Sequence, residues 1–138
     1  MNDIRRLTLR NDRAEIARLT TWIDDVVAPL GLSRRTAHAL HLCLEEAVTN
    51  VVTHAFEPGT VHDVEVALWH DDSVLHAEIT DDGYPFDPLS HVLPEAPKDL
   101  WSAPIGGLGI KLMRRFAKRI AYHRVGSTNR LTLSFSIP

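Results

Sequence analysis

Residues 33–55 read SRRTAHALHLCLEEAVTNVVTHA. Ser33 is a good helix N-cap, and the apolar residues after it recur at helical spacing. This apolar stripe consists of Leu40, Leu44, Ala47, Val48 and Val51. At about 100° per residue, Glu46 and Asn50 lie about 40° apart on the edge of the stripe, whereas Glu45 falls on the far side and is expected to be solvated. The stretch therefore predicts a long helix, ending at about Ala55, that presents a carboxylate and a carboxamide to a cleft.

Working outward from this helix, the hydrophobic pattern predicts the remaining elements. Strands are expected at Ile4–Arg10, Val64–Leu68, Val74–Thr80, Ala121–Val125 and Arg130–Ile137, and helices from Asn11-Asp12 to Pro29 and from Leu108 to Ala121. Strands grouped with helices, without regular βαβ alternation, indicate an α+β fold. We expect one domain, residues 1–138, built as a two-layer sandwich with a mixed, mostly antiparallel sheet and helices on one face.

Two glycine-containing motifs follow the long helix in the sequence. Asp81-Asp82-Gly83 comes after an apolar run, and Gly106-Gly107-Leu108-Gly109 opens the last predicted helix, where free backbone N–H groups favour phosphate. Taken alone, the first motif could be a simple turn and the second a flexible hinge. A dinucleotide fingerprint would need a third glycine where Leu112 stands, and no Gly-Lys-Ser/Thr of a Walker loop occurs. The order of the motifs favours a nucleotide site.

The same residues resemble the motifs of the GHKL superfamily of ATP-binding domains and, within it, the bacterial anti-sigma-factor serine/threonine kinases. The segment Glu46–Asn50 with His54 resembles the N box of that family, and Asp81 with Gly83 resembles its first glycine box. The glycines around Leu108 resemble its second glycine box. The likeness covers nearly the whole chain and implies the GHKL fold, with ATP and Mg²⁺ as cofactors.

The resemblance assigns a role to each of these residues. Glu46 is the expected catalytic base, and the amide oxygen of Asn50 is the expected Mg²⁺ ligand. Asp81 would accept a hydrogen bond from the exocyclic amine of adenine, while Gly83 would let the backbone approach the base. The full set of expected ATP-binding residues is Asn50, His54, Asp81, Gly83, Gly106, Gly107, Leu108 and Gly109. A solvated or ion-paired Glu46 and a helix-surface Asn50 are the simpler alternatives.

Residues 87–105 hold four prolines and little periodicity, so we expect them to form a lid over the phosphates. The resemblance implies a protein serine/threonine kinase that phosphorylates an anti-sigma-factor antagonist and sequesters a sigma factor by partner switching. Lys98 is the only Lys or Arg between Asp87 and Ile105, although phosphoryl transfer gains much from a cation on the γ-phosphate. The alternative is therefore a nucleotide-dependent binding module with little or no kinase activity. In either case Asn129 stands near the position of a family Gly-Thr pair that helps to hold adenine, and it can still donate a hydrogen bond.

Composition excludes several other classes of function. The formal charge of −3 argues against direct binding of nucleic acid, and no apolar run is long enough for a membrane span. Cys43 is alone among leucines and is expected to be a buried thiol of a cytoplasmic protein. The resemblance leaves a homodimer possible.

Two further clusters stand out in the sequence. His38, His41 and Glu45 share a helix face, but no fourth ligand of a structural zinc site is evident. Lys111, Arg114, Arg115 and Lys118 form a basic stripe on the last predicted helix. This stripe is either a solvated face or a docking surface for an acidic protein partner.

Overall fold

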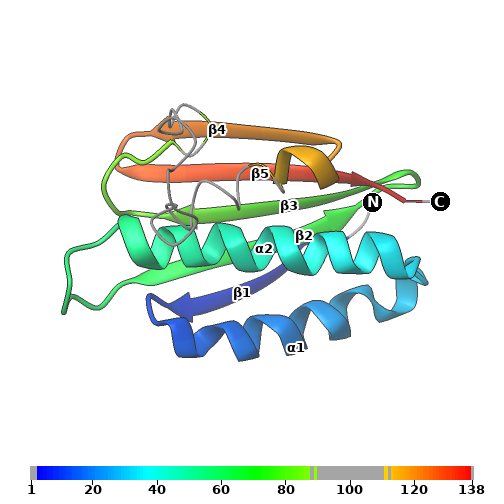
Figure 1. The fold of residues 1–138 in the computed structure, drawn as a ribbon, viewed down its shortest axis with the longest axis horizontal. Coiled ribbons are helices and arrows are strands. Elements are labelled where there is room, and N and C mark those ends of the chain that lie inside the picture. Colours follow the sequence, from blue (N-terminus) through cyan, green and yellow to red (C-terminus); the bar gives the residue numbers. More distant parts are fainter. Residues whose placement is uncertain (1–2, 88, 90–110, 112, 138) are drawn as a thin grey trace, which may run out of the picture.

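The computed structural model describes residues 3–87, 89, 111 and 113–137 of the chain. Within them, a single sheet has the strand order β1-β2-β3-β5-β4. The strands are Arg5–Arg10 (β1), Asp63–His70 (β2), Val74–Asp81 (β3), Arg119–Val125 (β4) and Thr128–Ser136 (β5). Each neighbouring pair is antiparallel, and the helices α1 and α2 cover one face of the sheet (Figure 1).

Both helices lie between β1 and β2 in the sequence. They are α1 (Ile16–Val27), flanked by the 3-10 turns η1 (Arg13–Glu15) and η2 (Ala28–Leu30), and α2 (Arg34–His54). Gly31 separates them with a φ of 59°, in the left-handed region that glycine favours. Ser33 then caps α2, because its hydroxyl oxygen accepts a hydrogen bond from the backbone N–H of Thr36 at 3.1 Å. The predicted start of the long helix is confirmed.

The core lies between the helix layer and the sheet. Burial alternates along β3 and β5 because successive strand side chains point to opposite faces. The largest fully buried side chains include Leu9, Leu19, Ile23, Leu40, Leu44, Leu68, Leu75, Ile79, Met113 and Leu133. Cys43 is a free, buried thiol in the same core, as the sequence predicts. The α+β architecture predicted from the sequence is thereby confirmed.

The C-terminal third differs from the prediction in two respects. The last helix was expected to run from Leu108 to Ala121, but its described part ends at Phe116, and β4 begins at Arg119. The backbone N–H of Lys118 already donates to Ser134 of β5 at 2.6 Å, so pairing with the sheet ends the helix. The expected mixed sheet is antiparallel at every described pair.

Some sequence-based expectations fall outside the described residues. The predicted lid is one of them, because only positions 87 and 89 of its range are described. The second glycine motif, residues 106–109, is another. None of the helices in the described ranges is both long enough and apolar enough to cross a membrane.

The cap of α2 can be tested by the substitution Ser33→Ala. We expect the free energy of unfolding to fall by about 1 kcal/mol, because the N–H of Thr36 loses its acceptor. Urea denaturation followed by circular dichroism measures the change. Ser127→Ala is the matched control, since Ser127 is exposed in the β4–β5 turn and its side chain has no hydrogen bond within the described ranges. Equal losses in both variants would contradict the capping role.

Candidate functional site

The C-terminal half of α2 carries two polar side chains that each have one buried atom without a partner among the described residues. Asn50 is only 5% exposed, and its Nδ2 has no acceptor among the described residues. Glu46 lies one turn earlier, and its buried Oε2 has no donor among them. An unsatisfied buried polar atom costs stability, so each of these two atoms calls for a partner such as a water molecule, an ion or a ligand.

Asn50 lines a cavity between α2 and the sheet. The cavity walls are Ala47, Asn50, Val51 and Ala55 from the α2 side, Ile79 and Asp81 of β3, Phe86, Tyr122 of β4, and Asn129 and Leu131 of β5. The enclosed space is about 20 Å³, which is close to the room needed by one water molecule. Polar groups at one end and apolar walls suit a flat, partly polar ligand.

Asp81 supplies the carboxylate of this cavity from the end of β3. It is 5% exposed, and its Oδ1 accepts hydrogen bonds from the backbone N–H of Gly83 at 2.8 Å and from Asn129 Nδ2 at 2.9 Å. Its Oδ2 has no hydrogen bond within the described part of the chain. Burial raises the pKa of Asp81 above its usual range, although the two hydrogen bonds act against this rise. One carboxylate oxygen is thus held by the fold and the other is free for a ligand.

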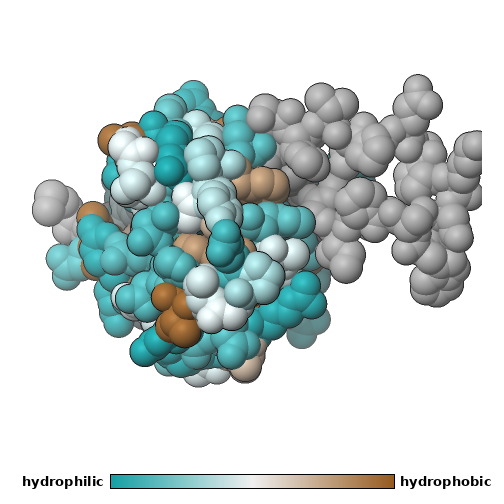
Figure 2. Space-filling model, turned by 90° about the vertical axis from the view of Figure 1, so that its left-hand side faces the viewer, coloured by the Kyte–Doolittle hydropathy of each residue, from teal (hydrophilic) through white to brown (hydrophobic). Residues whose placement is uncertain are grey.

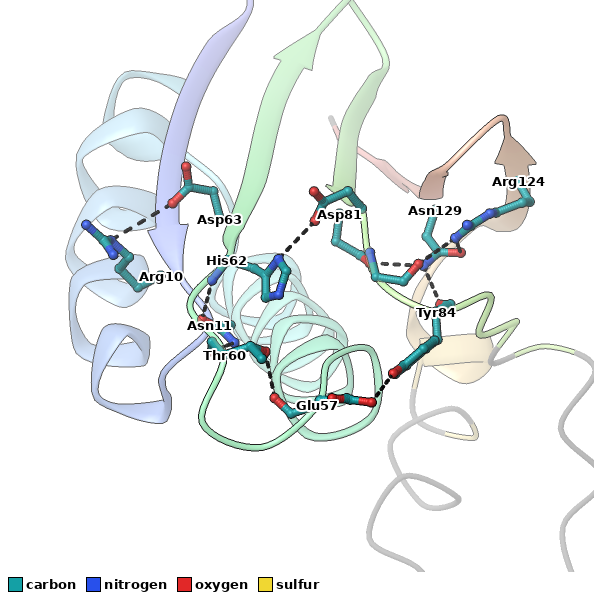
Figure 3. Close-up of polar contacts among 12 residues, drawn as sticks. Arg10, Asn11, Glu57, Thr60, His62, Asp63, Asp81, Tyr84, Arg124 and Asn129 are labelled. Atoms are coloured by element: carbon teal, nitrogen blue, oxygen red, sulfur yellow. Dashed lines mark hydrogen bonds and ion pairs between the residues drawn. The ribbon is translucent and has the colours of Figure 1, made fainter.

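Asn129 holds Asp81 in place from the opposite strand (Figure 3). Its Nδ2 also donates to the backbone oxygen of Tyr84 at 2.7 Å. Its Oδ1 accepts from the hydroxyl of Tyr122 and from Arg124 Nη1, the latter at 3.1 Å. Both amide hydrogens of Asn129 are therefore engaged within the fold. The sequence-based expectation was that Asn129 can donate a hydrogen bond beside the aspartate, and in this arrangement it donates to Asp81 itself.

Gly83 allows a close contact between two elements of the fold. A Cβ at this position would lie 2.2 Å from the carbonyl oxygen of Ala55, at the C-cap of α2. The next residue, Tyr84, donates its backbone N–H to that same oxygen at 2.8 Å. The sequence-based explanation for the glycine was approach to a bound base. The structure gives another reason, which is the passage of the loop against the end of the helix.

Arg124 also fastens this loop. Its Nη1 donates to the backbone oxygen of Gly83 at 2.7 Å and to Asn129 Oδ1, while its Nε donates to the oxygen of Gly126 at 3.1 Å. Arg124, Tyr122 and Tyr84 were not singled out from the sequence. The alternation along β4 could have placed Tyr122 and Arg124 on one face, but only the strand register puts them beside Asn129.

His54 and Glu45 have surroundings that the sequence did not reveal. His54 is exposed in the last turn of α2, and its ring stacks on Phe86 with centroids 5.1 Å apart. Glu45 was expected to be solvated, but it is half-buried and accepts a hydrogen bond from the Thr20 hydroxyl of α1 at 2.8 Å. Because α1 packs on this side of α2, the far side of the helix is a helix–helix contact.

Glu46 has the electrostatic character expected of a proton acceptor. Burial, and to a lesser extent the neighbouring Glu45 carboxylate, raise the pKa of Glu46. Burial and Glu46 together raise the pKa of Cys43 to about 12, so this thiol is inert near neutral pH. The described residues contain no group of three or more His, Cys, Asp or Glu side chains arranged to hold a metal ion. His41 instead pairs with Asp24 at 2.8 Å.

The surface around this end of the molecule is mostly hydrophilic (Figure 2). Its exposed large hydrophobic side chains are Val61 and Tyr84 in loops and Val125 at the end of β4. Figure 3 shows polar groups that converge from the end of β3 (Asp81), the loop after it (Tyr84) and the β4–β5 hairpin (Arg124 and Asn129). Such a site suits a ligand that has an apolar ring at one end and charged groups at the other.

Comparison with known proteins gives one sequence family and several solved structures. The chain matches the family described as the histidine kinase-like ATPase domain over residues 9–135. It is 33% identical over 113 residues to the serine/threonine-protein kinase BtrW of Bordetella bronchiseptica, which covers 82% of this chain and 80% of the relative.

Solved structures share the fold at low sequence identity. The RsbU and RsbW domains of Rv1364c from Mycobacterium tuberculosis align with a TM-score of 0.67 and 13% identity, covering 99% of this chain. This chain spans only 33% of that mycobacterial chain. The histidine kinase domain from Erythrobacter litoralis EL346 aligns with a TM-score of 0.57 and 17% identity, covering 91% of this chain and 60% of that one.

The raised pKa of Glu46 predicts a pH-dependent stability difference. A carboxyl whose pKa is raised by folding stabilises the folded state below its unfolded pKa, and this contribution is lost as the pH rises through the folded pKa. At pH 7 the charged Glu46 therefore destabilises the fold, and we expect Glu46→Gln to unfold at higher urea concentration than the wild type. The advantage should shrink as the pH falls to about 4, near the ordinary glutamate pKa. A difference independent of pH would contradict the raised pKa.

Proposed function

Because the chain belongs to the histidine kinase-like ATPase domain family, we propose that it is an ATP- and Mg²⁺-dependent protein serine/threonine kinase. The observation that carries the proposal is that Asn50 and Asp81 line the same cavity, and that Asn50 Nδ2 and Asp81 Oδ2 have no hydrogen-bond partner among the described residues. BtrW, the 33% identical relative, is named as a kinase of this specificity.

ATP suits the donors and acceptors that line this cavity. The free Oδ2 of Asp81 would accept a hydrogen bond from the exocyclic amine of adenine, between the apolar side chains of Ile79 and Leu131. The amide oxygen of Asn50 would be the protein ligand of Mg²⁺, which draws charge from the transferring phosphoryl group when bound. Gly106, Gly107, Leu108 and Gly109, with His54 at the rim, would complete the nucleotide site.

Glu46 is the proposed general base. Its orphaned carboxylate oxygen is available to take the proton of a serine or threonine hydroxyl on a partner protein. A raised pKa makes the carboxylate a stronger base, provided that it remains ionised at the working pH. The neighbouring Glu45 is occupied by Thr20, which leaves Glu46 as the acceptor on this part of α2.

The proposed partners follow from the family resemblance. They are a small anti-sigma-factor antagonist, which would be phosphorylated, and a sigma factor, which this protein would hold in the cytoplasm. The alternative remains a nucleotide-dependent binding module with little or no kinase activity. The scarcity of cations in residues 87–105, where Lys98 stands alone, favours that alternative.

ATP binding should depend on Asp81. Asp81→Asn replaces one carboxylate oxygen by an NH₂ donor, so the hydrogen bond to adenine is lost. We expect affinity to fall about tenfold to a hundredfold, the equivalent of about 1.5–3 kcal/mol for a charge-assisted hydrogen bond. Isothermal titration calorimetry measures the ATP affinity of each variant. Asp82→Asn is the matched control, because Asp82 is exposed and faces His62 at 3.6 Å. Equal affinity in Asp81→Asn and wild type would remove Asp81 from the site.

The kinase proposal and the binding-module alternative predict different results for the variant Glu46→Gln. This variant should keep nearly normal ATP affinity and slow phosphorylation of the antagonist by a factor of about 10² to 10⁴, because the amide cannot take the proton. Mass spectrometry of the antagonist after incubation measures the transfer, with Glu45→Gln as the matched control. Equal transfer by wild type and Glu46→Gln would rule out Glu46 as the base. No transfer by the wild type would favour the binding module.

A further inference from the structure

A second hollow lies at the other end of α2, away from the nucleotide site. Its volume is about 360 Å³, and it is formed by the first turns of α2, residues 115–118, and the end of β5. The floor is apolar and consists of Ala39, Phe116, Ala117 and Phe135. The rim carries the exposed cations Arg35, Arg115 and Lys118, with the hydroxyls of Thr36 and Ser136 between them. We call this hollow the cationic groove.

The cations of the groove have no acidic partners in the described part of the chain. Ion pairs involve other arginines, namely Arg6, Arg10, Arg18 and Arg130. Among the described residues, Arg115 contacts the ring of Phe116, 5.9 Å from its centroid. The clustering is local, because the whole chain has a net charge of −3. The groove therefore has a positive charge that no ion pair with the described residues neutralises.

The position of Arg34 and Arg35 strengthens this point. They occupy the first turn of α2, which contains no acidic residue. The N-terminus of a helix carries the positive end of its dipole, so cations there are unfavourable and an anion is favoured. The chain keeps two arginines where helix electrostatics disfavours them. A local rule broken without compensation within the fold is a common mark of a functional surface.

We propose that the cationic groove docks an acidic segment of a partner protein, with one apolar side chain of that segment inserted between Phe116 and Phe135. Charge complementarity with Arg35, Arg115 and Lys118 selects the acidic residues. The aromatic floor selects the apolar anchor. A nucleic acid is the less suitable occupant, because the hollow has room for only a few side chains and the protein as a whole is negative.

The groove does not take part in the proposed nucleotide site, but some of its residues lie close in sequence to the second glycine motif. Residues 115–118 follow the second glycine motif, and the N–H of Lys118 joins them to β5. A docked segment would therefore touch the part of the chain that leads out of the proposed phosphate-binding motif. Docking in the groove needs neither ATP nor Glu46, so its test is separate from the test of kinase activity.

The experiment uses the full chain and a fluorescein-labelled peptide of 12 residues, in which glutamates surround one central benzoyl-phenylalanine. Fluorescence anisotropy should show binding that weakens with added salt, and a peptide with lysine in place of glutamate should not bind. Arg35→Glu and Lys118→Glu should each weaken binding about tenfold or more, since a like charge replaces the attractive one. Arg5→Glu is the matched control, because Arg5 is exposed, outside the groove and without an ion pair in the described residues. Photocrosslinking should attach the peptide to residues of the groove floor.

Four outcomes would overturn the proposal. Equal weakening by Arg5→Glu would assign binding to net charge alone, and crosslinks elsewhere would assign it to another surface. Tighter binding of a single-stranded oligonucleotide, with the same dependence on Arg35 and Lys118, would make the groove a nucleic-acid site. A homodimer dissociated by Lys118→Glu, together with no peptide binding, would make it a contact between two copies of this chain. In each case ATP affinity, measured in parallel, reports separately on the nucleotide site.

Discussion

The candidate site depends on one close contact, the passage of Gly83 against the C-cap of α2. A side chain at Gly83 would collide with the carbonyl oxygen of Ala55, and that oxygen accepts the N–H of Tyr84. The contact fixes the end of β3 relative to the end of α2, and therefore fixes Asp81 relative to Asn50. Arg124 and Asn129 then attach the β4–β5 hairpin to the same loop. Three elements that are far apart in the sequence meet at one glycine.

Features that depend on residues close together in the sequence could be predicted from the sequence. Ser33 and the apolar stripe determine where α2 starts and which face it buries, and the strand pattern gives the α+β class. The motifs around Glu46 and Asp81 identified the GHKL-type ATP-binding family, which the family match and the 33% identical relative confirm. Such patterns can be recognised in a sequence because each reflects a local requirement of a helix, strand or turn.

Features set by contacts between distant residues were not predictable in the same way. The register of β5 against β3 and β4 puts Asn129 opposite Asp81 and Arg124 opposite Asn129, and a sequence contains no direct record of strand register. Glu45 looked solvated because the packing direction of α1 is unknown before the fold is assembled. The last helix was predicted too long because Ile120 extends its apolar spacing into β4, where pairing with the sheet overrides it.

The unpaired polar atoms of the site lower the stability of this part of the fold. Glu46 and Asn50 each bury an unpaired atom, and Asp81 keeps a buried carboxylate with a raised pKa, so this part of the fold is less stable than an apolar core would be. Tyr122 lines the same cavity as Asn50 and Asp81 and donates its hydroxyl to Asn129. A ligand that satisfies these atoms would recover the lost hydrogen bonds and stabilise the folded state by mass action. The hydrogen bonds that a ligand makes with these unpaired atoms would therefore contribute to the free energy of binding.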